Sequence, residues 1–233
     1  VLTNVVGSTA ARECDHVVYI RAGPEIGVAA TKTFSSQLVG LNLLAARLAD
    51  GGHDRQPDLV DALRGVPNDV QAILDESEAA AVVEEFADSE AFFFLGRGFD
   101  YPVALEGALK FKEITYEHAE GFAAGELKHG PLALVTAETP IFAVVTGKGE
   151  AARKTIGNVK EVEARDAPVI VVTDGAADAG RYADHVLEIP ATDERLAPLL
   201  ANVQLQLVAY HMAAGMGRSI DKPRHLAKSV TVE

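Results

Sequence analysis

With 233 residues, 48% of them hydrophobic, and a mean hydropathy of +0.10, the chain can bury one large core or two small ones. Its formal net charge of −13 argues against nucleic acid and anionic membranes as partners. A single cysteine, Cys14, excludes a disulfide framework and a cysteine-rich metal site, and it favours a reducing cytoplasm. No uninterrupted apolar run reaches about 18 residues, so the sequence predicts no membrane span.

The first 50 residues predict part of an α/β domain. Short buried strands are expected over residues 2–6 and 16–20, and apolar residues at helical spacing predict a helix over 31–49. Gly51 and Gly52 end this helix. Two strands and one helix are too few for a domain, and the chain begins at Val1 in a strand-like run. We therefore expect it to be a part of a longer protein, with this first domain truncated.

A polar, glycine-bearing stretch, residues 50–57, predicts a linker, and residues 58–88 predict one or two helices. A second α/β unit follows. Its strands are expected over 91–95, 140–145, 169–172 and 185–189, and its helices over 101–118, 150–165 and 195–215. Strands that alternate with helices favour a parallel sheet with helices on both faces.

A charged stripe interrupts the otherwise apolar helix predicted over 101–118. Glu106, Lys110 and Glu113 stand at i, i+4 and i+7, within about 60° of one helix face, and Glu117 extends the stripe. A helix that is apolar almost all round is usually buried, and buried charges are costly unless they are paired or used. The stripe therefore indicates either a functional site or, if this face is exposed, an ordinary solvated surface.

Two further motifs allow both a functional and a structural interpretation. Gly96-x-Gly98 follows a strand and precedes a helix, where backbone N–H groups can receive an anion, but a tight strand-to-helix turn explains it equally simply. The polar segment 125–131 contains His129, which can exchange a proton near neutral pH or merely brace its loop. No histidine spacing typical of a metal site is present.

The same ambiguity holds near the two ends of the chain. Residues 25–32 lead into the first long helix and either cap it or face the same crevice as the stripe. The terminal segment 223–233 is partly apolar and can dock on the protein. A docked lysine such as Lys228 can lose solvation and attack carbonyl groups, although an ordinary exposed lysine is the simpler interpretation.

Together these segments resemble the isomerase half of the glutamine–fructose-6-phosphate aminotransferase (glucosamine-6-phosphate synthase) family. The resemblance is carried by residues 101–114, 126–134, 226–233 and, with one or two substitutions, 23–32. The ending Leu-Ala-Lys-Ser-Val-Thr-Val-Glu is specific to this family, whereas other sugar isomerase (SIS) domains share the rest more loosely. The resemblance implies tandem flavodoxin-like SIS domains: a truncated first domain at 1–52, a connection at 53–75, and a complete second domain with an active-site tail at 76–233.

The resemblance also implies an activity. The family joins ammonia, taken from glutamine by a glutaminase domain, to fructose 6-phosphate and isomerises the product to glucosamine 6-phosphate, a step of hexosamine biosynthesis toward UDP-N-acetylglucosamine. It implies no metal and no organic cofactor, a cytoplasmic location and a homodimer.

Site residues follow from the resemblance by matching position. Glu113 is expected to be the base that moves a proton between C1 and C2 of the sugar. Lys110 is expected to stabilise the developing negative charge, with Glu106 holding it in place. His129 is expected to assist opening of the sugar ring, reaching the site of a neighbouring subunit.

Lys228 is expected to form the Schiff base with the open-chain ketose, while Val28 and Ala227 offer backbone contacts to the sugar. The family's phosphate loop of Ser-Gln-Ser-Gly type and its glutaminase domain with an N-terminal cysteine do not occur in these residues, and Cys14 does not match that cysteine. We therefore expect residues 1–233 alone to isomerise the sugar poorly or not at all.

Two alternatives stay open beside the synthase. A related SIS deglycase or sugar-phosphate deaminase shares the Glu113-bearing helix but is not expected to keep the same tail. A non-catalytic SIS module that binds sugar phosphates is favoured by the missing phosphate loop. It is disfavoured by the presence of Lys110, Glu113, His129 and Lys228 together.

Overall fold

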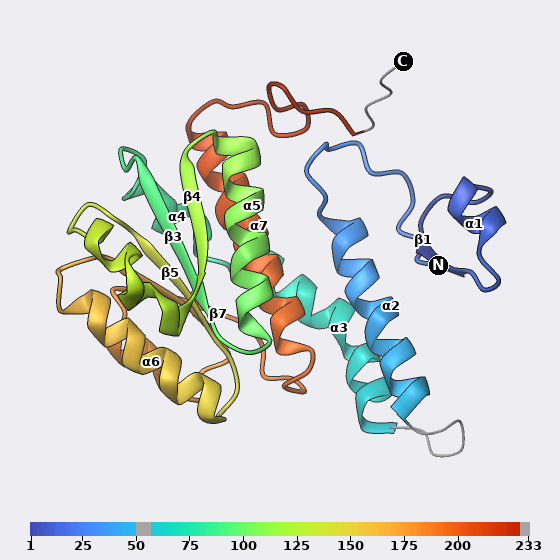
Figure 1. The fold of residues 1–233 in the computed structure, drawn as a ribbon, viewed down its shortest axis with the longest axis horizontal. Helices are drawn as coiled ribbons and strands as arrows, with labels where there is room; N and C mark the ends of the chain where they lie inside the picture. Colours follow the sequence, from blue (N-terminus) through green and yellow to red (C-terminus); the bar gives the residue numbers. More distant parts are fainter. Residues whose placement is uncertain (50–56, 229–233) are drawn as a thin grey trace.

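The computed structural model describes residues 1–49 and 57–228, and a five-stranded parallel sheet forms its centre (Figure 1). The strands lie in the order β4-β3-β5-β6-β7. Their bounds are Ala91–Gly96 for β3, His118–Ala123 for β4, Ile141–Val145 for β5, Val169–Thr173 for β6 and His185–Glu188 for β7. This is the flavodoxin-like order, in which the second strand of the unit lies outside the first. The expected α/β fold with a parallel sheet is confirmed.

Helices cover both faces of the sheet (Figure 1). One face is covered by α5 (Asp100–Thr115) and α7 (Ala197–Gly215), which pack with α3 (Pro57–Glu76) and α4 (Ala79–Glu84). The other face is covered by α6 (Glu150–Glu163) and three short 3₁₀ helices, η1 (Ala124–His129), η2 (Pro131–Leu134) and η3 (Ala179–Tyr182). Alternate residues of β3 point to opposite faces, so Phe92 and Phe94 join the α5–α7 core while Phe93 and Leu95 join the α6 core.

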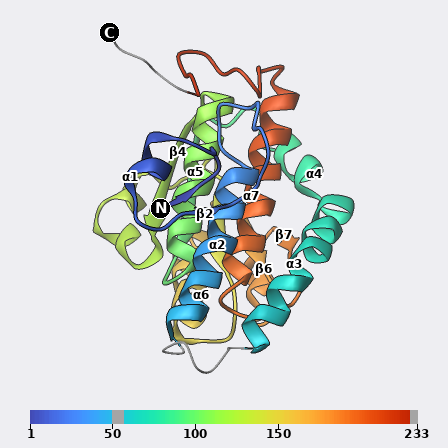
Figure 2. The ribbon, with the colours of Figure 1, turned by 90° about the vertical axis from the view of Figure 1, so that its right-hand side faces the viewer.

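The N-terminal segment is built from short elements. Its two-stranded parallel sheet pairs β1 (Leu2–Thr3) with β2 (Val18–Tyr19), and α1 (Thr9–Glu13) lies between them in the chain. The helix α2 (Lys32–Ala49) packs against α3 and α7, on the side of α7 that faces away from the main sheet (Figure 2). The predicted strands and the predicted helix over 31–49 are confirmed, although both strands are shorter than expected and α1 was not predicted.

One element boundary was predicted wrongly. The helix expected over 101–118 ends at Thr115, and a strand that the sequence did not suggest, β4, starts at His118. Tyr116 ends the helix with a left-handed backbone, φ 71°. The β4 sequence, His-Ala-Glu-Gly-Phe-Ala, contains no β-branched residue, so it lacks the usual composition of a strand. Glu117 therefore lies beyond the helix and does not extend the charged stripe.

The remaining elements follow the expected pattern. Residues 58–88, expected to form one or two helices, contain α3 and α4, and the other strands and helices start and end within two residues of the predicted bounds. Residues 50–56 of the predicted linker lie outside the described residues. Within the described ranges, no helix is long and apolar enough to cross a membrane.

The core of α7 contains one poorly satisfied polar side chain. Asn202 is 0% exposed, and neither atom of its amide has a hydrogen-bond partner among the described residues. A buried amide without partners costs about 1 to 3 kcal/mol. We therefore expect Asn202→Val to raise the free energy of unfolding by about 1 to 2 kcal/mol in urea denaturation.

Gln204, two positions away, is the matched control for Asn202. It is equally buried, but its amide accepts from Ser77 Oγ at 2.7 Å and donates to the Glu188 carbonyl at 2.6 Å. Gln204→Val removes both bonds and is expected to lower the free energy of unfolding. A loss of stability in both variants would contradict the assignment of Asn202 as an unpaired group.

Candidate functional site

The charged stripe of α5 is largely buried and internally paired. Lys110 Nζ lies 3.6 Å from Glu106 Oε1 and forms a closer ion pair with Glu113 Oε2. The side chain of Lys110 is 6% exposed, and those of Glu106 and Glu113 are 13% and 22% exposed. Burial raises the pKa of Glu106; Lys110 opposes this shift and the charge of Glu113 adds to it. The stripe is therefore not a solvated surface, and its use as a site stays a prediction.

Two packing features fix α5 where it carries the stripe. At its start, buried Asp100 accepts hydrogen bonds from the backbone N and the hydroxyl of Thr146 at 3.0 and 2.7 Å, just after β5. Burial raises the pKa of Asp100 to about 6, although these bonds oppose the shift. Halfway along, Gly107 meets α7 so closely that a Cβ there would lie 2.4 Å from Leu205 Cδ1. The two contacts fix the position of α5, and so of the stripe, relative to β5 and α7.

The Gly96-x-Gly98 motif serves the start of α5. A Cβ on Gly96 would lie 2.3 Å from the Asp100 carbonyl oxygen, and the Asp100 N–H donates to the Arg97 carbonyl at 3.2 Å. These contacts make it a tight strand-to-helix turn. The first residue of the helix is itself acidic, which opposes binding of an anion there.

A cavity of about 370 Å³ opens where the N-terminal loop, α5, α7 and the segment after α7 meet. Its wall includes Glu25 and Gly27 from the loop, Lys110 from α5, Tyr210 from α7 and Asp221 from the C-terminal segment. Figure 1 shows how this C-terminal segment leaves α7, passes above α5 and reaches the loop before α2. The loop 25–32 and Lys110 of the stripe thus line one cavity, which favours the functional interpretation of that loop.

Lys228 reaches this crevice from the end of the described chain. Its Nζ donates to Glu25 Oε2 at 2.6 Å and to the carbonyls of Gly27 and Val28 at 3.0 and 3.5 Å. The Lys228 side chain is 43% exposed, whereas that of Glu25 is 5% exposed. The docked-lysine interpretation is therefore the one that the geometry supports.

Glu25 is the site residue that the sequence did not reveal. Besides Lys228, it accepts from the Thr31 N–H at 2.9 Å and from the Thr33 hydroxyl at 2.5 Å. Burial alone would raise the pKa of Glu25, but the hydrogen bonds from Lys228, Thr33 and Thr31 outweigh it and lower the pKa to about 2. Glu25 is thus a fixed anion that anchors the lysine. Its partner stands 203 positions away, so no local pattern could have signalled the pair.

The lowered pKa of Glu25 implies that the free energy of unfolding depends on pH. Because its pKa is lower in the folded protein than the ordinary value of 4.5, ionised Glu25 stabilises the fold above pH 4.5, and this contribution is lost as the pH falls toward 2. A shift of this size is worth about 3 kcal/mol at neutral pH.

We expect Glu25→Gln to lower the free energy of unfolding at pH 7 and to flatten its dependence on pH between 4.5 and 2. Urea denaturation across this pH range measures both effects. Glu138→Gln, an exposed glutamate on the loop before β5, is the control and is expected to change neither. An unchanged pH profile in Glu25→Gln would contradict the assignment.

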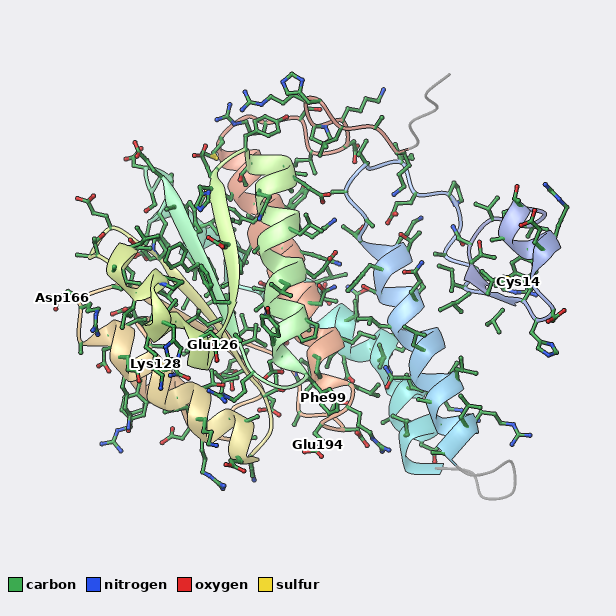
Figure 3. The ribbon with its side chains drawn as sticks, viewed as in Figure 1. Cys14, Phe99, Glu126, Lys128, Asp166 and Glu194 are labelled. Carbon is green, nitrogen blue, oxygen red and sulfur yellow. The ribbon has the colours of Figure 1, made fainter. Side chains whose placement is uncertain are left out.

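Three other predicted site residues do not line the cavity. The Val28 N–H donates to the Asp221 carbonyl at 3.0 Å, and the Val28 carbonyl receives Lys228, so its backbone is already engaged; Ala227 is exposed next to Lys228. His129 is exposed at the end of η1, a helix that belongs to the α6 face of the sheet. Figure 3 labels Glu126 and Lys128 of η1 on that side, away from α2. The chain therefore does not bring its own His129 to the cavity.

A larger cavity, about 540 Å³, lies elsewhere between α3, α7 and β7. Its charged lining consists of Glu76, Glu78, Asp184 and Glu188, with His185. His185 Nε2 lies 3.1 Å from Glu85 Oε2. Such a lining repels phosphate, and the described residues that form it include no lysine or arginine. The smaller cavity beside Lys110 and Lys228 is the better candidate for a phosphorylated substrate.

Comparison with known proteins identifies the family of this fold. The SIS domain model matches residues 1–47 and 85–216. Proteins named glutamine–fructose-6-phosphate aminotransferase (isomerizing) from Methanosarcina mazei and Halobacterium salinarum are each 56% identical across the whole chain. The chain spans only 38% and 39% of their length, corresponding to their C-terminal part.

Solved structures agree with these sequence matches. The C-terminal domain of glucosamine-fructose-6-phosphate aminotransferase from Francisella tularensis is 39% identical with a TM-score of 0.84, covering 94% of this chain and 63% of that one. Glucosamine-6-phosphate deaminase from Thermotoga maritima is 27% identical with a TM-score of 0.77, covering 99% and 66%. The chain therefore belongs to the SIS domain family and corresponds to the C-terminal isomerase part of relatives named glutamine–fructose-6-phosphate aminotransferase.

Proposed function

We propose that this chain forms the isomerase site of a glucosamine-6-phosphate synthase, which converts fructose 6-phosphate and glutamine-derived ammonia to glucosamine 6-phosphate in the cytoplasm. The observation that carries the proposal is a cavity lined by Lys110 of the buried stripe together with Glu25 and Gly27, the two residues that hold the Lys228 amine. A nucleophilic amine and a carboxylate base at one site suit an imine followed by proton transfer.

The first step is Schiff-base formation. The Lys228 amine, after giving up its proton, attacks the C2 carbonyl of the open-chain ketose, and the carbonyl oxygen leaves as water. Glu25 and the two backbone carbonyls keep the ammonium in place until the substrate enters. Ammonia then attacks the imine carbon and releases the lysine, which leaves a C2 imine of the sugar.

The second step moves one proton between neighbouring carbons. Glu113 removes a proton from C1, and the electron pair shifts to give an enolamine. Protonation of C2 by the same carboxyl group then leaves an aldehyde at C1 and an amine at C2, so C1 is oxidised and C2 reduced. Lys110 stabilises the negative charge that develops at the C1 oxygen, and Glu106 keeps Lys110 oriented from 3.6 Å.

We also propose that the protein works as a homodimer in which His129 serves the site of the partner copy. His129 is exposed on the face of the sheet opposite to its own stripe, and Leu134 of the adjacent η2 is 61% exposed. Mixing a His129→Ala protein with a Lys228→Ala protein, under conditions that exchange subunits, then tests the sharing of sites. About a quarter of the original activity is expected to return, because half the dimers are hybrids with one intact site each. No recovery would contradict a shared site.

Formation of glucosamine 6-phosphate from fructose 6-phosphate and ammonium, followed by mass spectrometry, tests the proposed activity. Unphosphorylated fructose is the substrate control, and Glu113→Gln is the protein control. We expect slow product formation from residues 1–233, because the phosphate loop of the family is not among them. A full-length protein that carries the phosphate loop and still neither forms product nor exchanges the C1 hydrogen with solvent would contradict the proposal.

A deaminase is the second candidate, since the Thermotoga maritima deaminase shares this fold at 27% identity. Its chemistry is the same sequence of steps in reverse. The deaminase assignment would be favoured if ammonia is released from glucosamine 6-phosphate at an initial rate far above the rate at which glucosamine 6-phosphate is formed.

A further inference from the structure

The residue that ends α5 has a conformation that tyrosine rarely adopts. Tyr116 has φ 71° and ψ 8°, and its N–H donates to the Lys112 carbonyl at 3.3 Å to close the helix. Glycine or asparagine usually occupies such a left-handed position, because a Cβ is strained there. A bulky side chain in a strained position points to a use for that side chain.

The Tyr116 side chain holds the segment that carries Lys228. Its hydroxyl accepts a hydrogen bond from the Arg224 N–H at 3.0 Å. The Arg224 guanidinium lies 4.4 Å from the centre of the ring, and that of Arg218 lies 5.2 Å away. Arg218 also lies 3.5 Å from Glu117 Oε1. One tyrosine thus contacts the terminal segment, residues 217–228, through two arginines and a backbone amide.

Along the chain, the residues that Tyr116 contacts lie between the end of α7 and Lys228. Between Arg218 and Arg224, the terminal segment is also fastened by the Asp221 carbonyl, which accepts from the Val28 N–H at 3.0 Å, by packing of Ile220 against the α5–α7 core, and by the buried ring of Pro223. Beyond Arg224, the contacts of Lys228 found among the described residues are the bonds of its own amine to Glu25, Gly27 and Val28. Those bonds must break when the amine attacks a carbonyl, so the position of Lys228 during the reaction depends on the upstream contacts.

We propose that Tyr116 is a positioning residue that clamps the terminal segment against the end of α5 so that the Lys228 amine stays at the cavity when it leaves Glu25. This proposal rests on the proposed function, because it gives the lysine a task in Schiff-base formation. Tyr116 is not part of the cavity wall, so it acts through the segment and not on the substrate.

The test uses two Tyr116 variants and one control. Tyr116→Asn tolerates the left-handed backbone and removes the ring, whereas Tyr116→Phe keeps the ring and removes only the hydroxyl. Tyr182→Leu is the matched control, because the Tyr182 ring also carries a cation, Lys160 at 4.2 Å, but lies on the α6 face of the sheet. The readouts are hydrogen exchange of the amides of 218–228 and the rate of borohydride-dependent labelling of Lys228 by fructose 6-phosphate.

We expect Tyr116→Asn to lower the maximal labelling rate about thirtyfold and Tyr116→Phe about threefold, given one hydrogen bond and two cation–π contacts. The half-saturating sugar concentration should not change, and exchange of 218–228 should rise in the same order. Tyr182→Leu should change neither readout. If Tyr116 only stabilised the fold, its loss would not lower the maximal labelling rate while leaving the half-saturating sugar concentration unchanged. Phenylalanine would also not restore part of the labelling rate.

Faster exchange without slower labelling in Tyr116→Asn would overturn the proposal, as would no change in either readout. If the unmodified protein takes no label from fructose 6-phosphate, the proposed function fails instead. Pyridoxal 5′-phosphate, which forms Schiff bases with lysines, then replaces the sugar as the probe of Lys228, with the same expected order of rates.

Discussion

Lys228→Arg is expected to abolish the borohydride-dependent attachment of fructose 6-phosphate to the protein. Arginine keeps the positive charge and can still contact Glu25, but its guanidinium does not lose a proton in proteins and cannot form the imine. The loss should therefore be complete, while the free energy of unfolding changes little. Mass spectrometry of the reduced protein and of its tryptic peptides measures the attachment and its position.

Lys222→Arg is the matched control for this experiment. Lys222 lies in the same terminal segment and is exposed, so it experiences the same sugar and borohydride without facing Glu25. We expect Lys222→Arg to be labelled as fast as the unmodified protein. Equal labelling of the Lys228→Arg protein would show that the attachment is non-specific and would remove Lys228 from the site.

Glu113→Gln is expected to slow exchange of the C1 hydrogen of fructose 6-phosphate with deuterated water by about 10²- to 10⁴-fold, the usual contribution of a positioned base. Glutamine keeps the shape and contact with Lys110 but cannot accept the proton. Labelling of Lys228 should persist in this variant, because the imine forms before the proton moves. NMR of the sugar over hours detects even slow exchange.

Glu120→Gln is the control for the carboxylate. Glu120 lies exposed on the edge strand β4, and its Oε2 lies 3.8 Å from His118 Nε2. It should leave C1 exchange unchanged. A Glu113→Gln protein that exchanges C1 at the original rate would contradict the assignment of the base, and another carboxylate, with Glu106 the nearest candidate, would have to take the role.

The sequence predicted the second α/β unit well because its signals are local. Buried strands such as β5 (Ile-Phe-Ala-Val-Val) and β6 (Val-Ile-Val-Val-Thr) consist mainly of Ile, Val and Phe, and the helix between them has clear apolar spacing. Strand β4 was missed because its alanine, glycine and glutamate lack strand propensity; it pairs with β3 only because α5 ends abruptly at Tyr116.

The site was predictable only in part. The stripe on α5 could be inferred from helical spacing, because Glu106, Lys110 and Glu113 belong to one helix. The Glu25–Lys228 pair and the arginines on Tyr116 join residues that are about 100 to 200 positions apart in the sequence, so only the fold reveals them. All roles in the reaction were carried over from the family resemblance and stay predictions, namely those of Glu106, Lys110, Glu113, Lys228, His129, Val28 and Ala227.

A crystal structure of the protein after reduction with fructose 6-phosphate and borohydride tests the central claim most directly. We expect a covalent bond from Lys228 Nζ to C2 of the sugar, with C1 about 3 to 3.5 Å from a Glu113 carboxylate oxygen. A sugar attached to another lysine, or one bound at Lys228 with C1 turned away from the α5 stripe, would contradict it.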